Sequence, residues 1–130
     1  MSWLRRVRGV PSWFQEGLAD WVAHTGHEIV SRRQARAAMT QGFRIVPEGS
    51  GRLPIPGRPH PPRGPTGPMF HAQSRMFVEY LRSRDANEFD GFLVAVLRGA
   101  EFEAAFGENF HIGLLEAWSD FQESMQAGPR

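Results

Sequence analysis

The stretch Pro11-Ser12-Trp13-Phe14-Gln15-Glu16-Gly17-Leu18-Ala19-Asp20-Trp21 opens the first strong helix signal in this chain of 130 residues. Ser12 is of a type that caps helices, and Gln15 three residues later completes the pattern of a capping box. Gly26 is the expected end of this helix. The pattern predicts one apolar face, because large hydrophobic residues recur at helical spacing, namely Trp13, Phe14, Leu18, Trp21 and Val22.

The same helix carries two carboxylates one turn apart, Glu16 and Asp20. Residues at positions i and i+4 lie on one face of a helix, so both side chains can point at a single group. Gly17 would let another backbone element approach closely. An acidic pair at this spacing is also the ordinary solvated face of an amphipathic helix, and the helix dipole alone favours Glu in the first turn.

Around this helix the chain divides into three parts, which we interpret as one mainly α-helical domain spanning residues 1–130. Residues 1–46 hold the first helix, a weaker helix over Ser31–Met39 and a short strand expected over Phe43–Val46. Residues 47–68 contain eight Pro and five Gly, which block both helix and sheet hydrogen bonding, so we expect a long irregular loop. Residues 69–126 are expected to form a helical bundle.

The bundle is predicted from three apolar patterns and a short turn. Met69–Arg84 forms the first helix, and a second is capped by Asn87 and ended by Gly99. A helical turn over Glu101–Phe106 is expected to stop at Gly107, and the last helix lies near Ile112–Met125. The apolar faces are assigned to Phe70, Phe77, Tyr80 and Leu81, to Phe89, Phe92, Leu93, Val96 and Leu97, and to Leu114, Leu115, Trp118, Phe121 and Met125.

The opening stretch resembles a segment of gluzincin-type zinc metallopeptidases (peptidase MA-like), P-x-W-x-x-E-G-L-A, which follows their HExxH helix. The stretch Gln73–Leu81, the Phe-rich segment 89–99 and the Trp-containing segment 114–121 are similar to the helices downstream in that family. The resemblance implies the C-terminal portion of a zincin-like domain, with 47–68 as a variable insertion. It implies that Glu16 is the third protein ligand of zinc and that Asp20 hydrogen-bonds a zinc-bound His. A set of two His and one Glu is a standard catalytic zinc site.

One departure from the family decides what we expect of activity. No His-Glu-x-x-His occurs in the sequence, and no His precedes Glu16. The two imidazole ligands and the general base are therefore missing, so the chain contains no complete catalytic set. We expect zinc and a peptide or protein substrate only for an intact domain, in which an HExxH-containing chain would be the partner. We expect the isolated chain to be inactive and to bind no zinc tightly.

Other candidate site residues are weaker. The family often supplies a hydrogen-bond donor from its downstream helices, and His71 is a weak candidate for that role because Phe70 lacks a hydroxyl. The cluster His24, His27 and Glu28 has the wrong order for an inverted zincin motif, and we interpret it as a polar helix end. The favoured interpretation of both His71 and His111 is a partly exposed structural histidine.

Composition excludes several other functions. There is no Cys, which rules out disulfides and thiolate zinc sites. The net charge is +1, and the Arg residues at 5, 6, 8, 32, 33 and 36 fit a solvated face, so we expect no nucleic-acid partner. No signal peptide or membrane span is evident, and the compartment stays open. The alternative to a peptidase part is a non-catalytic helical module that binds a protein partner.

Overall fold

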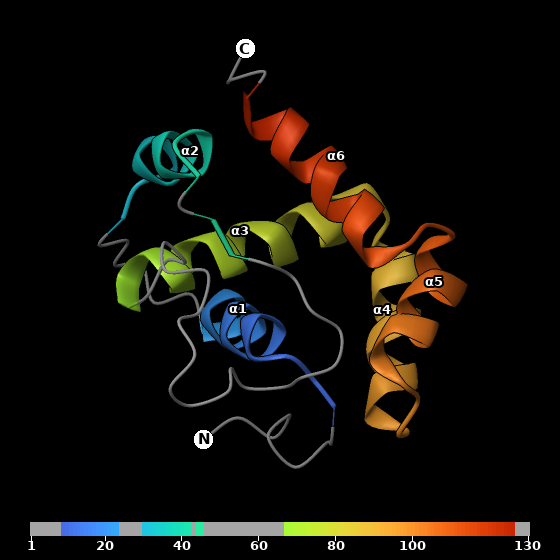
Figure 1. Cartoon of the computed structure of the whole chain (residues 1–130). Helices are drawn as coiled ribbons and strands as arrows, with labels where there is room; N and C mark the ends of the chain where they lie inside the picture. The colour runs from blue at the N-terminus through green and yellow to red at the C-terminus, as the bar shows by residue number, and fades with distance from the viewer. Residues whose placement is uncertain (1–8, 24–29, 43, 46–66, 127–130) are drawn as a thin grey trace, which may run out of the picture.

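A computed structural model of the chain describes residues 9–23, 30–42, 44–45 and 67–126 (Figure 1). These ranges contain six α-helices and no strand, which confirms the expected mainly α-helical fold. The helices are α1 (Ser12–Ala23), α2 (Arg32–Thr40), α3 (Gly67–Arg84), α4 (Ala86–Leu97), α5 (Phe102–Phe110) and α6 (Leu114–Gln126).

The long helix α3 is the centre of the fold, and α1 lies along one side of it (Figure 1). The two backbones approach so closely at Gly17 that a Cβ built there would lie 2.5 Å from the carbonyl oxygen of Ser74. Only Gly fits such a contact. The close approach expected for Gly17 is therefore confirmed, and its partner is the backbone of α3.

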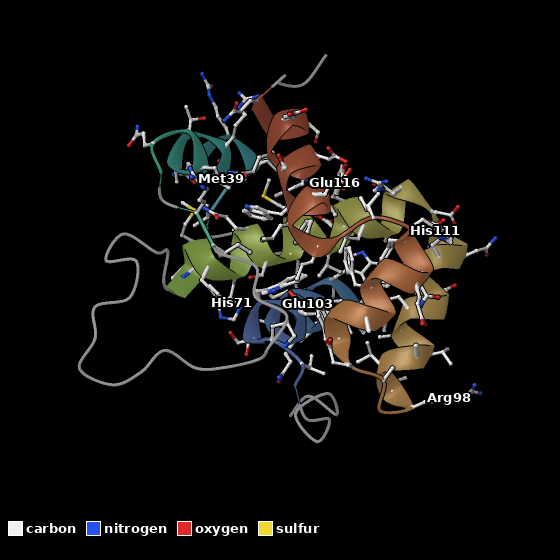
Figure 2. The ribbon with its side chains drawn as sticks, turned by 45° about the vertical axis from the view of Figure 1, so that its right-hand side comes forward. Met39, His71, Arg98, Glu103, His111 and Glu116 are labelled. Carbon is white, nitrogen blue, oxygen red and sulfur yellow. The ribbon has the colours of Figure 1, made fainter. Side chains whose placement is uncertain are left out.

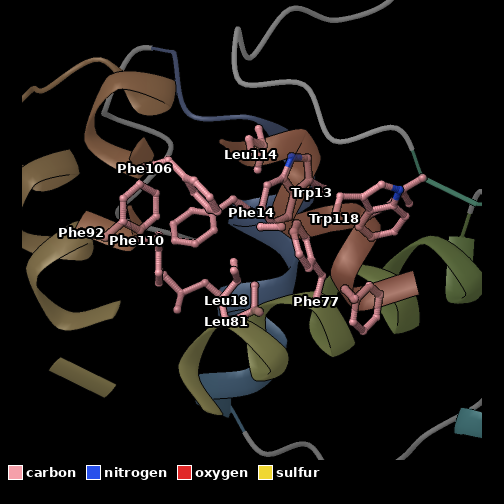
Figure 3. Close-up of a cluster of buried hydrophobic side chains, with 14 of the residues drawn as sticks. Trp13, Phe14, Leu18, Phe77, Leu81, Phe92, Phe106, Phe110, Leu114 and Trp118 are labelled. Atoms are coloured by element: carbon pink, nitrogen blue, oxygen red, sulfur yellow. The ribbon is translucent and has the colours of Figure 1, made fainter. Parts of the chain in front are cut away.

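The hydrophobic core fills the space between α1, α3 and the C-terminal helices, and aromatic rings dominate it (Figure 3). Phe14 is fully buried, and its ring contacts those of Phe89, Phe92 and Phe102. Trp13 contacts Phe77 with ring centroids 4.9 Å apart. Tilted and edge-to-face aromatic pairs add about 0.5–1.5 kcal/mol each beyond the area that they bury. The apolar face of α1 thereby packs into one core with rings from α3, α4 and α5.

Helices α4 and α5 pack against each other, and α6 runs back across α3 (Figure 1). Helix α2 lies beside α3 and α6. Its N-terminus is closed by a capping box, in which Ser31 Oγ accepts from the backbone N–H of Gln34 and the Gln34 side chain accepts from the N–H of Ser31. The helix predicted over Ser31–Met39 is thus present, shifted by one residue.

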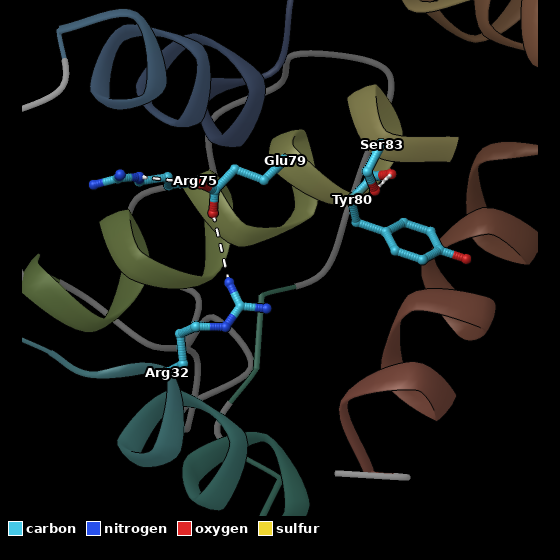
Figure 4. Close-up of polar contacts among 5 residues, drawn as sticks. All are labelled: Arg32, Arg75, Glu79, Tyr80 and Ser83. Atoms are coloured by element: carbon cyan, nitrogen blue, oxygen red, sulfur yellow. Dashed lines mark hydrogen bonds and ion pairs between the residues drawn. The ribbon is translucent and has the colours of Figure 1, made fainter. Parts of the chain in front are cut away.

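Polar contacts hold α2 and the segment after it against α3. Glu79 lies between two guanidinium groups, 3.7 Å from Arg32 and 3.8 Å from Arg75 (Figure 4). The buried side chain of Gln73 accepts a hydrogen bond from the backbone N–H of Ile45 at 3.0 Å. Arg44 and Ile45 are not in a strand, whereas the ends of the predicted strand, Phe43 and Val46, lie outside the described residues.

Several predicted helix ends were wrong. Ser12 is the first residue of α1 rather than its cap, because Phe14 and Gln15 donate their backbone N–H groups to the carbonyl of Pro11. The Gln15 side chain donates instead to the carbonyl of Val10 at 2.8 Å. The cap of α4 is Asp85, which accepts from the N–H of Glu88, so Asn87 is inside the helix. The end expected at Gly26 lies outside the described residues.

Two further boundaries differ. Helix α3 begins at Gly67, so Pro68 belongs to its first turn, where a missing N–H costs nothing; residues 47–66 of the expected loop are outside the described ranges. Helix α5 continues through Gly107 to Phe110 and ends at His111, which adopts the left-handed conformation. Gly99, with φ of +93°, follows the end of α4 as predicted.

The apolar faces were predicted correctly for most positions. Three of the assigned side chains are exposed instead, namely Val22, Leu97 and Leu115. Each stands at the edge of its helix's apolar stripe. The buried side of α6 is completed by Ala117, which the periodicity of large residues did not mark.

Candidate functional site

Two carboxylates of α1 and one imidazole of α3 meet on the surface where these helices cross. Nδ1 of His71 lies 3.1 Å from Oδ2 of Asp20 and 3.7 Å from Oε2 of Glu16. The side chains are 44% (His71), 30% (Asp20) and 29% (Glu16) exposed. Figure 2 shows His71 in the first part of α3, beside α1. The three residues singled out from the sequence are therefore neighbours, and we call them the Glu16–Asp20–His71 cluster.

The local structure explains why they meet. Trp13, Phe14 and Leu18 turn toward the core, which leaves Glu16 and Asp20 on the flank of α1. The glycine contact at Gly17 brings the two helix backbones together at Ser74. His71 lies one helical turn before Ser74 and so faces the same flank. The expectation that Glu16 and Asp20 share a face is confirmed by their common neighbour.

Hydrogen-bond chemistry assigns a direction to the shorter contact. An ionised carboxylate only accepts, so this contact is a hydrogen bond in the form of the ring that carries a hydrogen on Nδ1, with Nδ1 of His71 donating to Asp20. The Glu16 contact is longer than a hydrogen bond and lies within ion-pair range, where it attracts the imidazole when the ring is protonated. The contact between Asp20 and His71 was not predicted from the sequence. The two residues are 51 positions apart, and no sequence pattern links them.

Zinc requires more ligands than this part of the chain provides. A catalytic zinc ion takes three protein ligands and one water. In the described ranges no group of three or more His, Asp, Glu or Cys side chains is arranged to hold a metal ion. The side chain of Glu16 is partly exposed on the flank of α1. The residues described here do not form a zinc site by themselves.

The other candidates lie elsewhere or outside the described residues. His111 follows α5, far from His71 in Figure 2, and its Nε2 is 3.6 Å from Glu88. His24, His27 and Glu28 fall in a range that the structure does not describe. Phe70 is partly buried against the core, next to His71. Two residues that sequence reasoning did not mark as structural, Gln73 and Ser74, are the buried polar side chains of α3.

Comparison with protein-family models, with curated proteins and with solved structures finds no match for this chain. In the described part of the chain no helix is both long enough and apolar enough to cross a membrane.

Proposed function

We propose that this chain is the C-terminal part of a gluzincin-type zinc metallopeptidase domain and that Glu16 is its zinc ligand. One observation carries the proposal: Glu16 and Asp20 share one flank of α1 and converge on a single imidazole. A carboxylate that only keeps the helix surface solvated would not need a second carboxylate and an imidazole beside it. The close packing of Gly17 supports it further, because this glycine follows the ligand directly in the motif.

The proposed roles follow the positions of the three side chains. Glu16 supplies one oxygen ligand, while two imidazoles come from an HExxH helix that this chain lacks. Zinc held in this way would supply an activated water for peptide-bond hydrolysis. Asp20 orients an imidazole through a charge-assisted hydrogen bond, and His71 stands beside the ligand as a hydrogen-bonding group on α3. The sequence contains no HExxH motif to supply the general base and the two imidazole ligands, so we expect the isolated chain to be inactive.

A calorimetric zinc titration of the isolated chain tests the negative half of the proposal. We expect no submicromolar stoichiometric binding, in wild type or in Glu16→Ala. Tight zinc binding that disappears in Glu16→Ala would contradict this negative half, since it would require a complete ligand set within this chain.

The coding sequence immediately before Met1 tests the positive half. An in-frame His-Glu-x-x-His there, within about two or three helical turns and a loop, would identify a truncated peptidase domain. A genuine start at Met1 with no chain elsewhere that supplies the motif would argue for a degenerate domain without activity.

A second function, a helical module that binds another protein, is favoured by exposed apolar side chains. Val94 and Leu97 lie one turn apart on α4 and are each 46% exposed, and Leu115 on α6 is 64% exposed. Sedimentation equilibrium would test this function. Self-association that weakens in the double variant Val94→Ser, Leu97→Ser would favour this binding function. A protein that stays monomeric and binds no HExxH-containing chain would count against it.

A further inference from the structure

The contact between Asp20 and His71 joins two helices through one specific ring nitrogen. Nδ1 of His71 lies at hydrogen-bond distance from Asp20, 3.1 Å, and at a clearly longer distance from Glu16, 3.7 Å. Both neighbours are carboxylates, which accept hydrogens and do not donate them when ionised. A hydrogen bond between a neutral His71 and ionised Asp20 therefore requires the proton on Nδ1.

The other ring nitrogen is left with its lone pair. Among the described residues Nε2 of His71 has no hydrogen-bond partner, and the side chain is 44% exposed. In a neutral imidazole with its proton on Nδ1, Nε2 is the acceptor. The ring thus exposes a hydrogen-bond acceptor on the surface beside Glu16, the residue proposed as the zinc ligand.

We propose that Asp20 is a positioning residue that holds His71 in the Nδ1–H form, so that Nε2 accepts a hydrogen bond from a ligand bound on this flank. The ligand chemistry is an N–H or O–H donor, such as a peptide amide or a water. The identity of that ligand rests on the proposed function, whereas the positioning role concerns the metal-free chain. This role differs from the one that the family resemblance implies for Asp20, which concerns a zinc-bound imidazole.

The tautomer of His71 is measured directly by two-bond proton–nitrogen NMR of the isolated chain. The spectrum is recorded at alkaline pH, where neutral imidazole rings dominate. His71→Gln identifies the signals of this ring among the five histidines. We expect the Nδ1–H form to be the major form in wild type and the minor form in Asp20→Ala.

Two controls separate positioning from general electrostatics and from loss of structure. Glu16→Gln removes the more distant carboxylate, and the Nδ1–H form of His71 should persist. His111 meets Glu88 through Nε2 rather than Nδ1, so it should not show the same preference. Ala favours helix, so Asp20→Ala should keep the helical circular dichroism of wild type and its His111 signals.

Three results would overturn the proposal. His71 could be mainly in the Nε2–H form in wild type, or its tautomer could be unchanged in the folded Asp20→Ala variant. Loss of the Nδ1–H form in Glu16→Gln alone would instead assign the positioning to Glu16. None of these results depends on zinc, so failure here is distinguishable from failure of the proposed function.

Discussion

At the scale of single residues, Gly17 has the strongest steric requirement among the described glycines. Its Cβ position falls 2.5 Å from the oxygen and 2.7 Å from the carbon of the Ser74 carbonyl, and 2.9 Å from Cγ2 of Val78. The first two atoms belong to backbone, which cannot rotate away. The glycine therefore sets the distance between α1 and α3, and with it the contact of Asp20 with His71.

Gly17→Ala should destabilise the protein by about 1–3 kcal/mol through overpacking, measured as the free energy of unfolding in urea. Gly107→Ala is the matched control, since Gly107 is also helical and a Cβ there meets nothing within 4 Å. That change should stabilise by up to about 1 kcal/mol, because Ala is the better helix former. Equal effects of both substitutions would mean that the two helices do not touch as described.

His111 stores strain that a glycine would release. It has φ of +64° directly after α5, and its Nε2 makes only a 3.6 Å contact with Glu88 from a largely exposed side chain. Such surface contacts contribute little. His111→Gly should therefore raise the free energy of unfolding, by at most about 1–2 kcal/mol. A destabilised variant would show that the contact with Glu88 matters more than the backbone conformation.

At the scale of helices, the sequence predicts that α4 begins with a capping residue but does not decide which residue that is. Asp85 and Asn87 both precede the apolar run and both are good caps, so composition alone does not choose between them. The extended backbone of Asp85, with φ of −164°, selects the earlier residue.

Asp85→Ala should cost about 1 kcal/mol of stability, because it leaves the N–H of Glu88 without its acceptor. Asn87→Ala should cost nothing or stabilise slightly, since that side chain lies inside the helix and is exposed. Thermal unfolding of the two variants checks this order. The opposite order would return the cap to Asn87.

The helices themselves were predictable because their apolar faces repeat at helical spacing, as Phe89, Phe92 and Val96 do on α4. Their ends were less predictable, since Gly107 is a helix terminator by type and yet continues α5. For the site, the i, i+4 spacing of Glu16 and Asp20 was sufficient to predict a shared face. The partnership with His71 depends on the tertiary crossing of α1 and α3, which no local pattern encodes.

At the scale of the whole molecule, stability depends on an aromatic core that links distant parts of the chain. Phe92 is fully buried, and its ring contacts those of Phe14 on α1 and of Phe102, Phe106 and Phe110 around α5. It thereby connects α4 to the helix that carries Glu16 and Asp20.

Phe92→Ala should cost about 3–5 kcal/mol, a large part of the roughly 5–15 kcal/mol that stabilises a small domain. We expect the midpoint of urea unfolding to fall strongly. The loss of stability should extend to α1 as well as to α4. Val94→Ala, on the exposed side of the same helix, is the control and should change stability by less than about 1 kcal/mol. Similar costs for both would contradict the assignment of the core.

The central claim is that the carboxylate of Glu16 is placed to bind zinc, and it is tested most directly on the chain joined to an HExxH helix ahead of α1. Zinc affinity is measured by calorimetry for the wild type, for Glu16→Gln and for Glu79→Gln, which removes a carboxylate that pairs with Arg32 and Arg75. The account predicts stoichiometric zinc binding that weakens by about tenfold or more in Glu16→Gln and is unchanged in Glu79→Gln. Equal zinc affinity of the wild type and Glu16→Gln would contradict it.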